Sequence, residues 1–238
     1  MNPLSLDQPW GRGYRVKHAH AFAGDTPLPT SHYLPRGLGR SYGDLCVNDG
    51  GTLLHNFRRD RLLEFDNVSG VLSCESGATL ADIAQVMLPR GWFLPVVPGT
   101  RYVTVGGAIA NDVHGKNHHV AGSFGGFVES LTLARSDCAT AVRIAPDHPR
   151  FATTVAGLGL SGLMLDTDIR LKRIPGPGIE QEIRLFGGRR SGGGIDGYLE
   201  LDADSKPWEY TVGWIDTLDR NLRGVFFRGR HCDGPDEW

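Results

Sequence analysis

A glycine-rich turn that runs into a histidine cluster is the sequence feature that most restricts the fold. The segment from Pro98 to His119 reads PGTRYVTVGGAIANDVHGKNHH. Glycines let the backbone approach a bound group closely, and the imidazole and ammonium groups that follow can take part in proton movement. A second glycine-rich loop, PRGLGRSYGD, lies upstream at residues 35–44. Two such loops indicate one large anionic ligand.

Composition and charge exclude several classes of protein. The 238 residues are 40% hydrophobic, which allows a substantial core in one large domain or two modest ones. The formal net charge is −2, and no basic stripe interleaved with aromatic residues is present, so we expect no nucleic-acid partner. No secretory signal and no apolar run of about 18 residues is found. We therefore expect a cytoplasmic protein without a membrane-spanning segment.

The cysteines and histidines do not follow metal-ligand spacing. Cys46, Cys74, Cys138 and Cys232 are scattered, as expected for reduced thiols. The histidine cluster offers neither an H-E-x-x-H pattern nor a supporting cysteine pair. We therefore expect no metal site.

Hydrophobic periodicity predicts mixed strands and helices. The expected strands are 52–54, 62–65, 70–74, 128–134, 141–144 and 162–171. Leu80, Ile83, Ala84 and Met87 follow helical spacing, so we predict a helix over 80–90 that Thr79 caps and Gly91 ends. The run 92–97, divided by proline, is read as a strand or an extended approach to the glycine-rich turn.

Proline and glycine at 174–178 predict a domain boundary. Beyond it we expect a flexible stretch at 187–194, a short helix at 196–203 and a strand at 210–215. This region has few apolar positions for an independent core. It is therefore interpreted as the beginning of a larger domain.

The two loops differ as predicted anion sites. In the first, glycines at 37, 39 and 43 permit a nest of inward-facing amides, although a plain structural turn remains the alternative. Tyr42 stands where a dinucleotide fingerprint needs glycine, so a Rossmann fold is excluded. In the second, Thr104 predicts a capped helix start whose amides face an anion. His114 and Lys116 are the candidates for reaction chemistry, whereas a structural or surface role is the default for the other two histidines, at 118 and 119.

Four segments together resemble a known family. PRGLGRSYGD, GATLADIAQVMLPRGW, PVVPGTRYVTVGGAIANDVHGKNHHVAGSFG and VAGLGLSGLM are similar, in order and spacing, to FAD-dependent oxidoreductases of the vanillyl-alcohol-oxidase type. The similarity is dense over residues 30–172 and fainter at 210–216. It implies an α+β fold, with a PCMH-type FAD-binding domain of two α+β subdomains at 1–174. Residues 175–238 would begin a substrate (cap) domain that is truncated.

The resemblance also implies a set of cofactor-binding residues. The pyrophosphate would contact Arg36, Gly37, Leu38, Gly39, Arg40, Ser41, Tyr42 and Gly43. Other contacts would come from Gly99, Thr104, Val105, Gly106, Gly107, Asn111, Asp112, Val113, His114 and the main chain of Met164. Several relatives bond the flavin covalently to a histidine where this chain has Arg40, so we expect non-covalent FAD.

The activity implied by the resemblance is oxidation of a sugar secondary hydroxyl, with hydride transfer to flavin N5. Tyr42, His114 and Lys116 would be catalytic, and Lys116 and Trp214 would bind substrate, with ordinary strand packing as the alternative for Trp214. The substrate would be a small or lipid-linked sugar of cell-wall arabinan biosynthesis, which would bring the protein to a membrane surface. A short-chain reductase or a separately encoded C-terminal half would be a partner. A sugar-1,4-lactone oxidase and a flavin-binding remnant without turnover remain alternatives.

Overall fold

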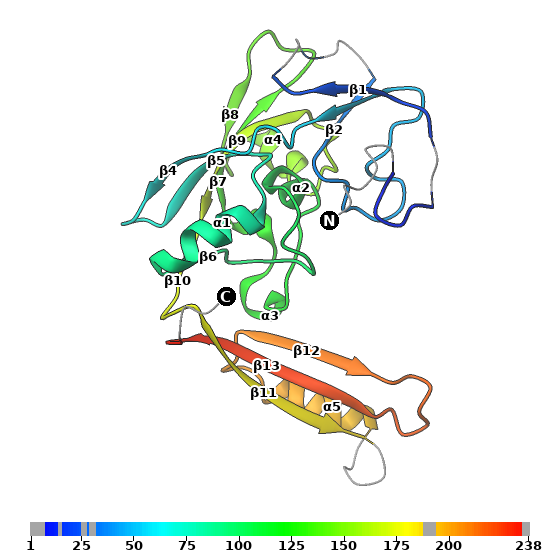
Figure 1. Cartoon of the computed structure of the whole chain (residues 1–238), viewed down its shortest axis with the longest axis vertical. Coiled ribbons are helices and arrows are strands. Elements are labelled where there is room, and N and C mark those ends of the chain that lie inside the picture. Colours follow the sequence, from blue (N-terminus) through cyan, green and yellow to red (C-terminus); the bar gives the residue numbers. More distant parts are fainter. Residues whose placement is uncertain (1–7, 14–15, 25–27, 29–31, 188–193, 235–238) are drawn as a thin grey trace.

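The structure, a computed structural model, describes residues 8–13, 16–24, 28, 32–187 and 194–234. Residues 188–193 of the stretch expected to be flexible lie outside these ranges. The described residues form helices and four sheets, so the expected α+β class is confirmed. Figure 1 shows three of the sheets in an upper body and the fourth below it.

A small parallel sheet carries the first glycine-rich loop. It consists of β1 (Ala19–Phe22), β3 (Thr52–His55) and β2 (Tyr33–Arg36), with β3 in the middle. Only β3 was expected from the sequence. Since β2 ends at Arg36, the loop leaves the carboxyl edge of this sheet.

An antiparallel sheet of five strands forms the centre of the upper body. Its order is β4 (Leu62–Asp66), β5 (Val71–Glu75), β9 (Leu163–Arg170), β7 (Val128–Ala134) and β8 (Val142–Ile144). All five strands were predicted, with ends that differ by at most one residue. Their inward side chains share one core with two helices, α1 (Leu80–Met87) and α2 (Val105–Ala110). The core includes Leu72, Leu80, Ile83, Ile109, Leu131 and Ile169.

Helix α1 has the predicted capping box. The Thr79 hydroxyl accepts from the Asp82 amide, and the Asp82 carboxylate accepts from the Thr79 amide. The helix is shorter than predicted because Pro89 follows, and the chain continues as a 3-10 turn, η1 (Leu88–Arg90). Gly91, with φ of 76°, ends the turn in the left-handed conformation.

Short elements complete the upper body. Strand β6 (Trp92–Phe93) pairs with β10 (Lys172–Arg173). The other elements are α3 (His118–Ala121), η2 (Phe124–Phe127) and α4 (Pro149–Thr154). None of the helices in the described ranges is long and apolar enough to cross a bilayer.

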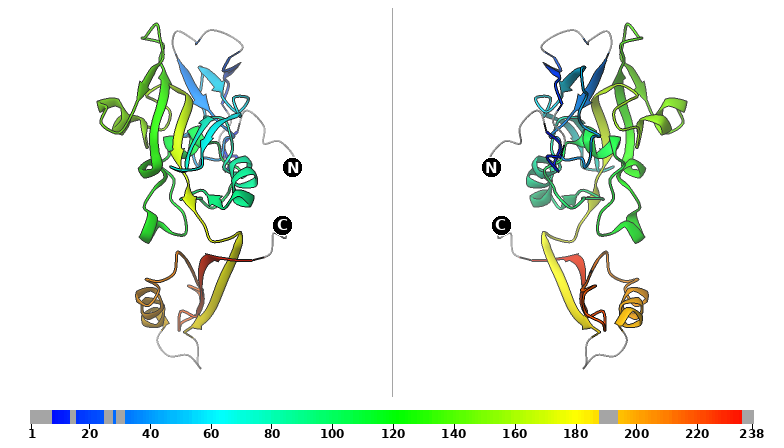
Figure 2. Two further views of the ribbon diagram at one scale, coloured as in Figure 1. Left: turned by 90° about the vertical axis from the view of Figure 1, so that its left-hand side faces the viewer. Right: turned by 90° about the vertical axis from the view of Figure 1, so that its right-hand side faces the viewer.

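The last part of the described chain forms its own antiparallel sheet. Strand β13 (Gly224–Cys232) lies between β11 (Gly178–Phe186) and β12 (Tyr210–Ile215). Helix α5 (Gly194–Ala203) packs on it through Tyr198, whose ring lies 5.7 Å from that of Phe186 and 5.5 Å from that of Phe226. Figure 2 shows this sheet and α5 as a separate lower body, joined to the upper body where β10 leads into β11. The helix and β12 were predicted, whereas β11 and β13 were not.

Candidate cofactor site

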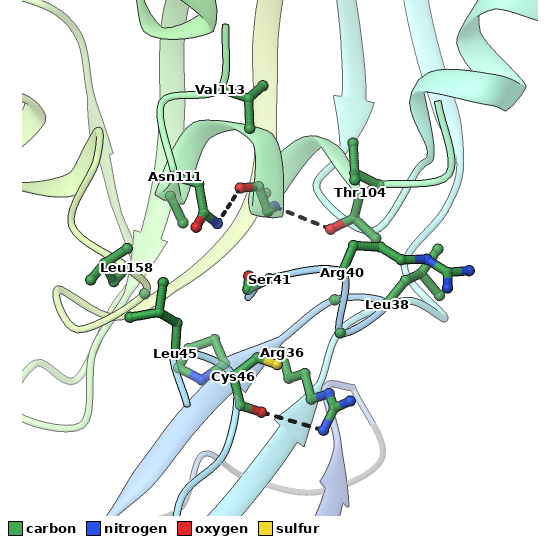
Figure 3. Close-up of a pocket in the computed structure, with 18 of the residues that line it drawn as sticks. Arg36, Leu38, Arg40, Ser41, Leu45, Cys46, Thr104, Asn111, Val113 and Leu158 are labelled. Atoms are coloured by element: carbon green, nitrogen blue, oxygen red, sulfur yellow. Dashed lines mark hydrogen bonds between the residues drawn. The ribbon is translucent and has the colours of Figure 1, made fainter. Parts of the chain in front are cut away.

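A cavity of about 570 Å³ opens where the loop after β2 meets α2 and the start of β9. Both glycine-rich loops line it, so the expectation that they face a common space is correct. Figure 3 shows Arg40 and Ser41 of the first loop lying opposite Thr104 and Asn111. Of the predicted cofactor residues, those that line the cavity are Arg36, Gly37, Leu38, Gly39, Arg40, Ser41, Tyr42, Gly99, Thr104, Gly106, Gly107, Asn111, Val113, His114 and Met164.

The amides of the first loop are available to a ligand. Within the part of the chain that the structure describes, no backbone N–H from Gly37 to Tyr42 donates to another protein group. All six residues line the cavity, and Gly39 adopts a positive φ of 63°. Successive unpaired amides around a concave surface attract an anion such as a diphosphate. The loop therefore has the features of an anion nest.

Arg36 organises this loop from beneath. Its side chain is buried, and its guanidinium donates to the carbonyls of Cys46 at 3.3 Å and Gln8 at 2.7 Å. A methyl group on Gly39 would lie 2.1 Å from the same guanidinium, and φ there is 63°, so a side chain at this position would displace the guanidinium and strain the backbone. Arg36 therefore lines the cavity but donates to carbonyl groups of its own chain.

Arg40 connects the two loops. Its Nε donates to the carbonyl of Tyr102 at 3.1 Å, and its guanidinium carbon lies 5.6 Å from the centre of the Trp10 ring. Arg40 thus closes one side of the cavity by joining residues from three segments of the chain. The geometry also leaves no histidine at this position for a covalent bond to a ligand.

The second loop contributes differently from the prediction. The first-turn amides of α2 are already bonded: Val105 donates to Ala78, Gly106 to Ser76, and Gly107 to the Thr104 hydroxyl. The expectation that these amides face an anion is therefore wrong, because the Thr104 cap and the turn between β5 and α1 accept their hydrogen bonds. The second loop instead packs closely against the first, since a methyl group on Gly37 would lie 2.3 Å from the Thr104 hydroxyl.

Two polar residues of the cavity wall were missed in the sequence. The amide nitrogen of Asn56 donates to the carbonyl of Met164 at 3.1 Å, and the Ser76 hydroxyl donates to the same carbonyl. The carboxamide oxygen of Asn56 is buried and lacks a partner within the described ranges. Met164 therefore lines the cavity with a carbonyl that is already occupied. Because Asn56 and Ser76 follow different strands, no sequence pattern connects them.

Three predicted cofactor residues do not reach the cavity. The Asp112 carboxylate accepts from the Ser123 hydroxyl and the Gly125 amide, each at 2.8 Å, and so points into its own loop. Val105 is fully buried in the core, and Gly43 begins a turn beyond the nest. These three residues therefore do not line the cavity, and their contact with a cofactor stays a prediction.

The predicted reaction residues separate into two groups. His114 lines the cavity and lies beside His118, with ring centres 5.2 Å apart. Tyr42 stands at the cavity rim with 75% of its surface exposed. Lys116 and Trp214 do not line the cavity, and Trp214 is 68% exposed on β12. The carbonyl of Lys116 instead accepts from the Thr211 amide at 2.9 Å.

The cavity fits a flavin dinucleotide in its polar features: a nest of free amides, glycines that approach closely, and an unpartnered buried acceptor. A family model described as an FAD binding domain matches residues 16–148. The chain therefore belongs to the family of FAD-binding domains. The matched residues include the parallel sheet, both glycine-rich loops and α2.

Three similar proteins align with parts of the chain. A decaprenylphosphoryl-beta-D-ribose oxidase of Mycolicibacterium smegmatis is 42% identical over 191 residues, which is 79% of this chain and 40% of the relative. A D-lactate dehydrogenase of Anaerostipes hadrus is 25% identical over 54% of this chain and 28% of its own length. A probable mitochondrial D-2-hydroxyglutarate dehydrogenase of Oryza sativa subsp. indica is 28% identical over 40% of this chain and 16% of its own length. The chain thus spans less than half the length of each of these relatives.

Proposed function

We propose that this chain binds FAD without a covalent bond and forms the flavin-binding part of an oxidoreductase acting on a sugar secondary hydroxyl. The single observation that carries the proposal is the row of unpaired amides from Gly37 to Tyr42 along the cavity. Arg40, which cannot form the bond that a histidine forms with flavin, supports dissociable binding. Residues 1–174 are proposed as the FAD-binding domain and residues 175–238 as part of a substrate domain.

The identity with the decaprenylphosphoryl-ribose oxidase supports a lipid-linked sugar as the substrate class. Such a substrate would place the protein in the cytoplasm at a membrane surface. Oxidation of a secondary hydroxyl yields a ketone, so a short-chain reductase that consumes this ketone would be a suitable partner.

Bound FAD would supply the acceptor for the hydride of the alcohol carbon. In the protein, the first loop would hold the diphosphate, and Asn56 would offer a buried acceptor to a ligand hydroxyl or N–H group. His114, which lines the cavity, would accept the alcohol proton, and Tyr42 would contact the substrate at the rim. Lys116, two residues after His114, and Trp214 would contact parts of the substrate that extend outside the cavity.

The first test is flavin binding by the whole chain. We expect the protein to quench added FAD fluorescence and become yellow, and acid precipitation to release all flavin into the supernatant. Flavin retained in the precipitate would contradict dissociable binding. A folded chain that neither quenches nor retains FAD would overturn the whole proposal.

The second part of the test is reduction. Anaerobic addition of a polyprenylphosphoryl pentose should bleach the bound flavin, whereas a sugar-1,4-lactone should not. His114→Ala should keep the yellow colour and slow bleaching. Bleaching by the lactone alone would assign the chain to the lactone-oxidising alternative.

Binding without turnover is the second candidate function. It is favoured by the position of Lys116 and Trp214 outside the cavity. A yellow protein that no sugar substrate bleaches would support this candidate over the oxidoreductase.

A further inference from the structure

A short segment, residues 208–211, connects the lower sheet with the loop from His114 to His119. The Thr211 amide donates to the carbonyl of Lys116 at 2.9 Å. A ring nitrogen of His119, Nε2, lies 3.3 Å from the carbonyl of Trp208. Because β12 is an edge strand, this loop occupies part of its open edge. The position of the loop therefore depends on the position of segment 208–211.

The same segment is held from the other side by a hydrogen-bonded chain across strands. Lys172 Nζ of β10 donates to the Tyr210 hydroxyl of β12 at 2.8 Å. That hydroxyl lies 3.0 Å from Nε2 of His231 on β13. The Glu209 carboxylate forms an ion pair with Lys172, and the Phe93 ring of β6 lies 5.1 Å from the His231 ring. Upper and lower bodies thus meet in one polar cluster.

The direction of these hydrogen bonds follows from the chemistry of the groups. A charged lysine can only donate, so the Tyr210 oxygen accepts from Lys172 and its hydrogen is directed to His231. His231 Nε2 must then be an acceptor, which requires a neutral imidazole with its proton on Nδ1. A second proton on His231 would remove the acceptor and place a second cation next to Lys172.

We propose that Lys172, Tyr210 and His231 form an acid-sensitive latch that holds segment 208–211, and with it the loop carrying His114, against the FAD-binding domain. The latch rests on contacts between protein groups and does not depend on flavin binding. Because His114 lines the cavity, opening the latch would free one wall of the candidate cofactor site.

The electrostatics of the cluster agree with this geometry. Burial, together with the positive charge of Lys172, lowers the pKa of His231 to about 4. Burial also lowers the pKa of Lys172 to about 8, while the neighbouring Glu209 carboxylate favours its charged form. Other titratable or charged groups lie near this end of β13, and they are His119, Glu180, Arg230, Cys232 and Asp233.

The sign of the pH dependence follows from proton linkage. In the open state the pKa of His231 returns to about 6.5, so the open state binds more protons at acid pH. The latch is then fully formed above about pH 6.5 and weakens as the pH falls toward 4, by at most about ten-fold in its opening constant per pH unit.

The test compares hydrogen exchange of two amides in the whole chain without added FAD. The Thr211 amide reports the latch, and the Val105 amide, which donates to Ala78, reports the FAD-binding domain. We expect the protection of Thr211 relative to Val105 to fall between pH 6.5 and 4.5. In His231→Gln, whose amide oxygen accepts from Tyr210 without titrating, the ratio should stay constant.

A matched control separates the two histidines that touch this region. His119→Gln should keep the acid fall, because His119 contacts Trp208 without contacting Tyr210. The proposal is overturned if the wild-type ratio is flat, if the fall disappears in His119→Gln, or if it persists in His231→Gln, as it would if Glu209 were responsible. Should His231→Gln fail to fold, Lys172→Met decides, since loss of that charge should shrink the fall and an unchanged fall overturns the latch.

Discussion

At the scale of single residues, several polar groups around the candidate site form hydrogen bonds within the protein, which leaves them unavailable to a ligand. Arg36 and the first-turn amides of α2 looked like anion-binding groups in the sequence, yet they bond to carbonyls and a hydroxyl of their own chain. A sequence pattern can indicate that an arginine or a glycine-rich helix start belongs to a site. It does not indicate which groups accept the hydrogen bonds that the guanidinium and the backbone amides donate. In the first loop, by contrast, the amides from Gly37 to Tyr42 donate to no protein group within the described residues.

Gly37→Ala tests the close approach between the loops. The added methyl group would lie 2.3 Å from the Thr104 hydroxyl, so the first loop and the cap of α2 must move apart. We expect the FAD dissociation constant to rise at least about ten-fold, the equivalent of about 1.4 kcal/mol. Gly126→Ala is the matched control, because a methyl group there meets nothing within 4 Å and no positive φ is required. Equal affinities in a fluorescence titration of both variants would refute this role for Gly37.

At the scale of elements, the sequence predicted those helices and strands that depend on residues close together in the chain. The capping box of α1 and the five strands of the central sheet follow from periodicity and from residues within a turn of each other. Strand β13 was missed because Gly224 and Gly229 look like breakers. In the structure, a methyl group on Gly224 would lie 2.2 Å from the Trp214 carbonyl, so this glycine permits strand contact. That requirement comes from the neighbouring strand β12 and cannot be recognised from the residues next to Gly224.

Thr79→Ala tests the best predicted element. Loss of the cap leaves the Asp82 amide without its acceptor, so the free energy of unfolding should fall by about 1 kcal/mol. The measurement is urea unfolding followed by circular dichroism. Thr140→Ala, at an exposed position outside any helix or strand, should change the free energy of unfolding by less than half as much. A stability loss in Thr140→Ala as large as that in Thr79→Ala would show that the cap is not the cause.

At the scale of the whole molecule, function-bearing groups come together from distant parts of the chain. Asn56 and Ser76 meet at the Met164 carbonyl, and Lys172, Tyr210 and His231 meet between the two bodies. The five side chains do not stand out by their neighbours in sequence, because they lie on different strands or directly after them. The sequence therefore predicted the loops of the site and missed the residues that strands bring to it.

The start of the described chain is part of this long-range arrangement. Trp10 donates its amide to the Ser41 carbonyl at 3.3 Å and lies beside the Arg40 guanidinium. We expect Trp10→Ala to weaken FAD binding several-fold in equilibrium dialysis, because Arg40 loses the ring that steadies it. Leu218→Ala, at a side chain that is 95% exposed, is the control and should bind as wild type does. Unchanged affinity in Trp10→Ala would remove Trp10 from the site.

The bond from Arg36 to the Gln8 carbonyl has a practical consequence for anyone who expresses this protein. A purification tag fused close to Gln8 would disturb the hydrogen bond from Arg36 to the Gln8 carbonyl, and with it the base of the cavity. In sequence, Gln8 is far from both glycine-rich loops. Low flavin occupancy in such a preparation would then reflect the fusion and not the native chain.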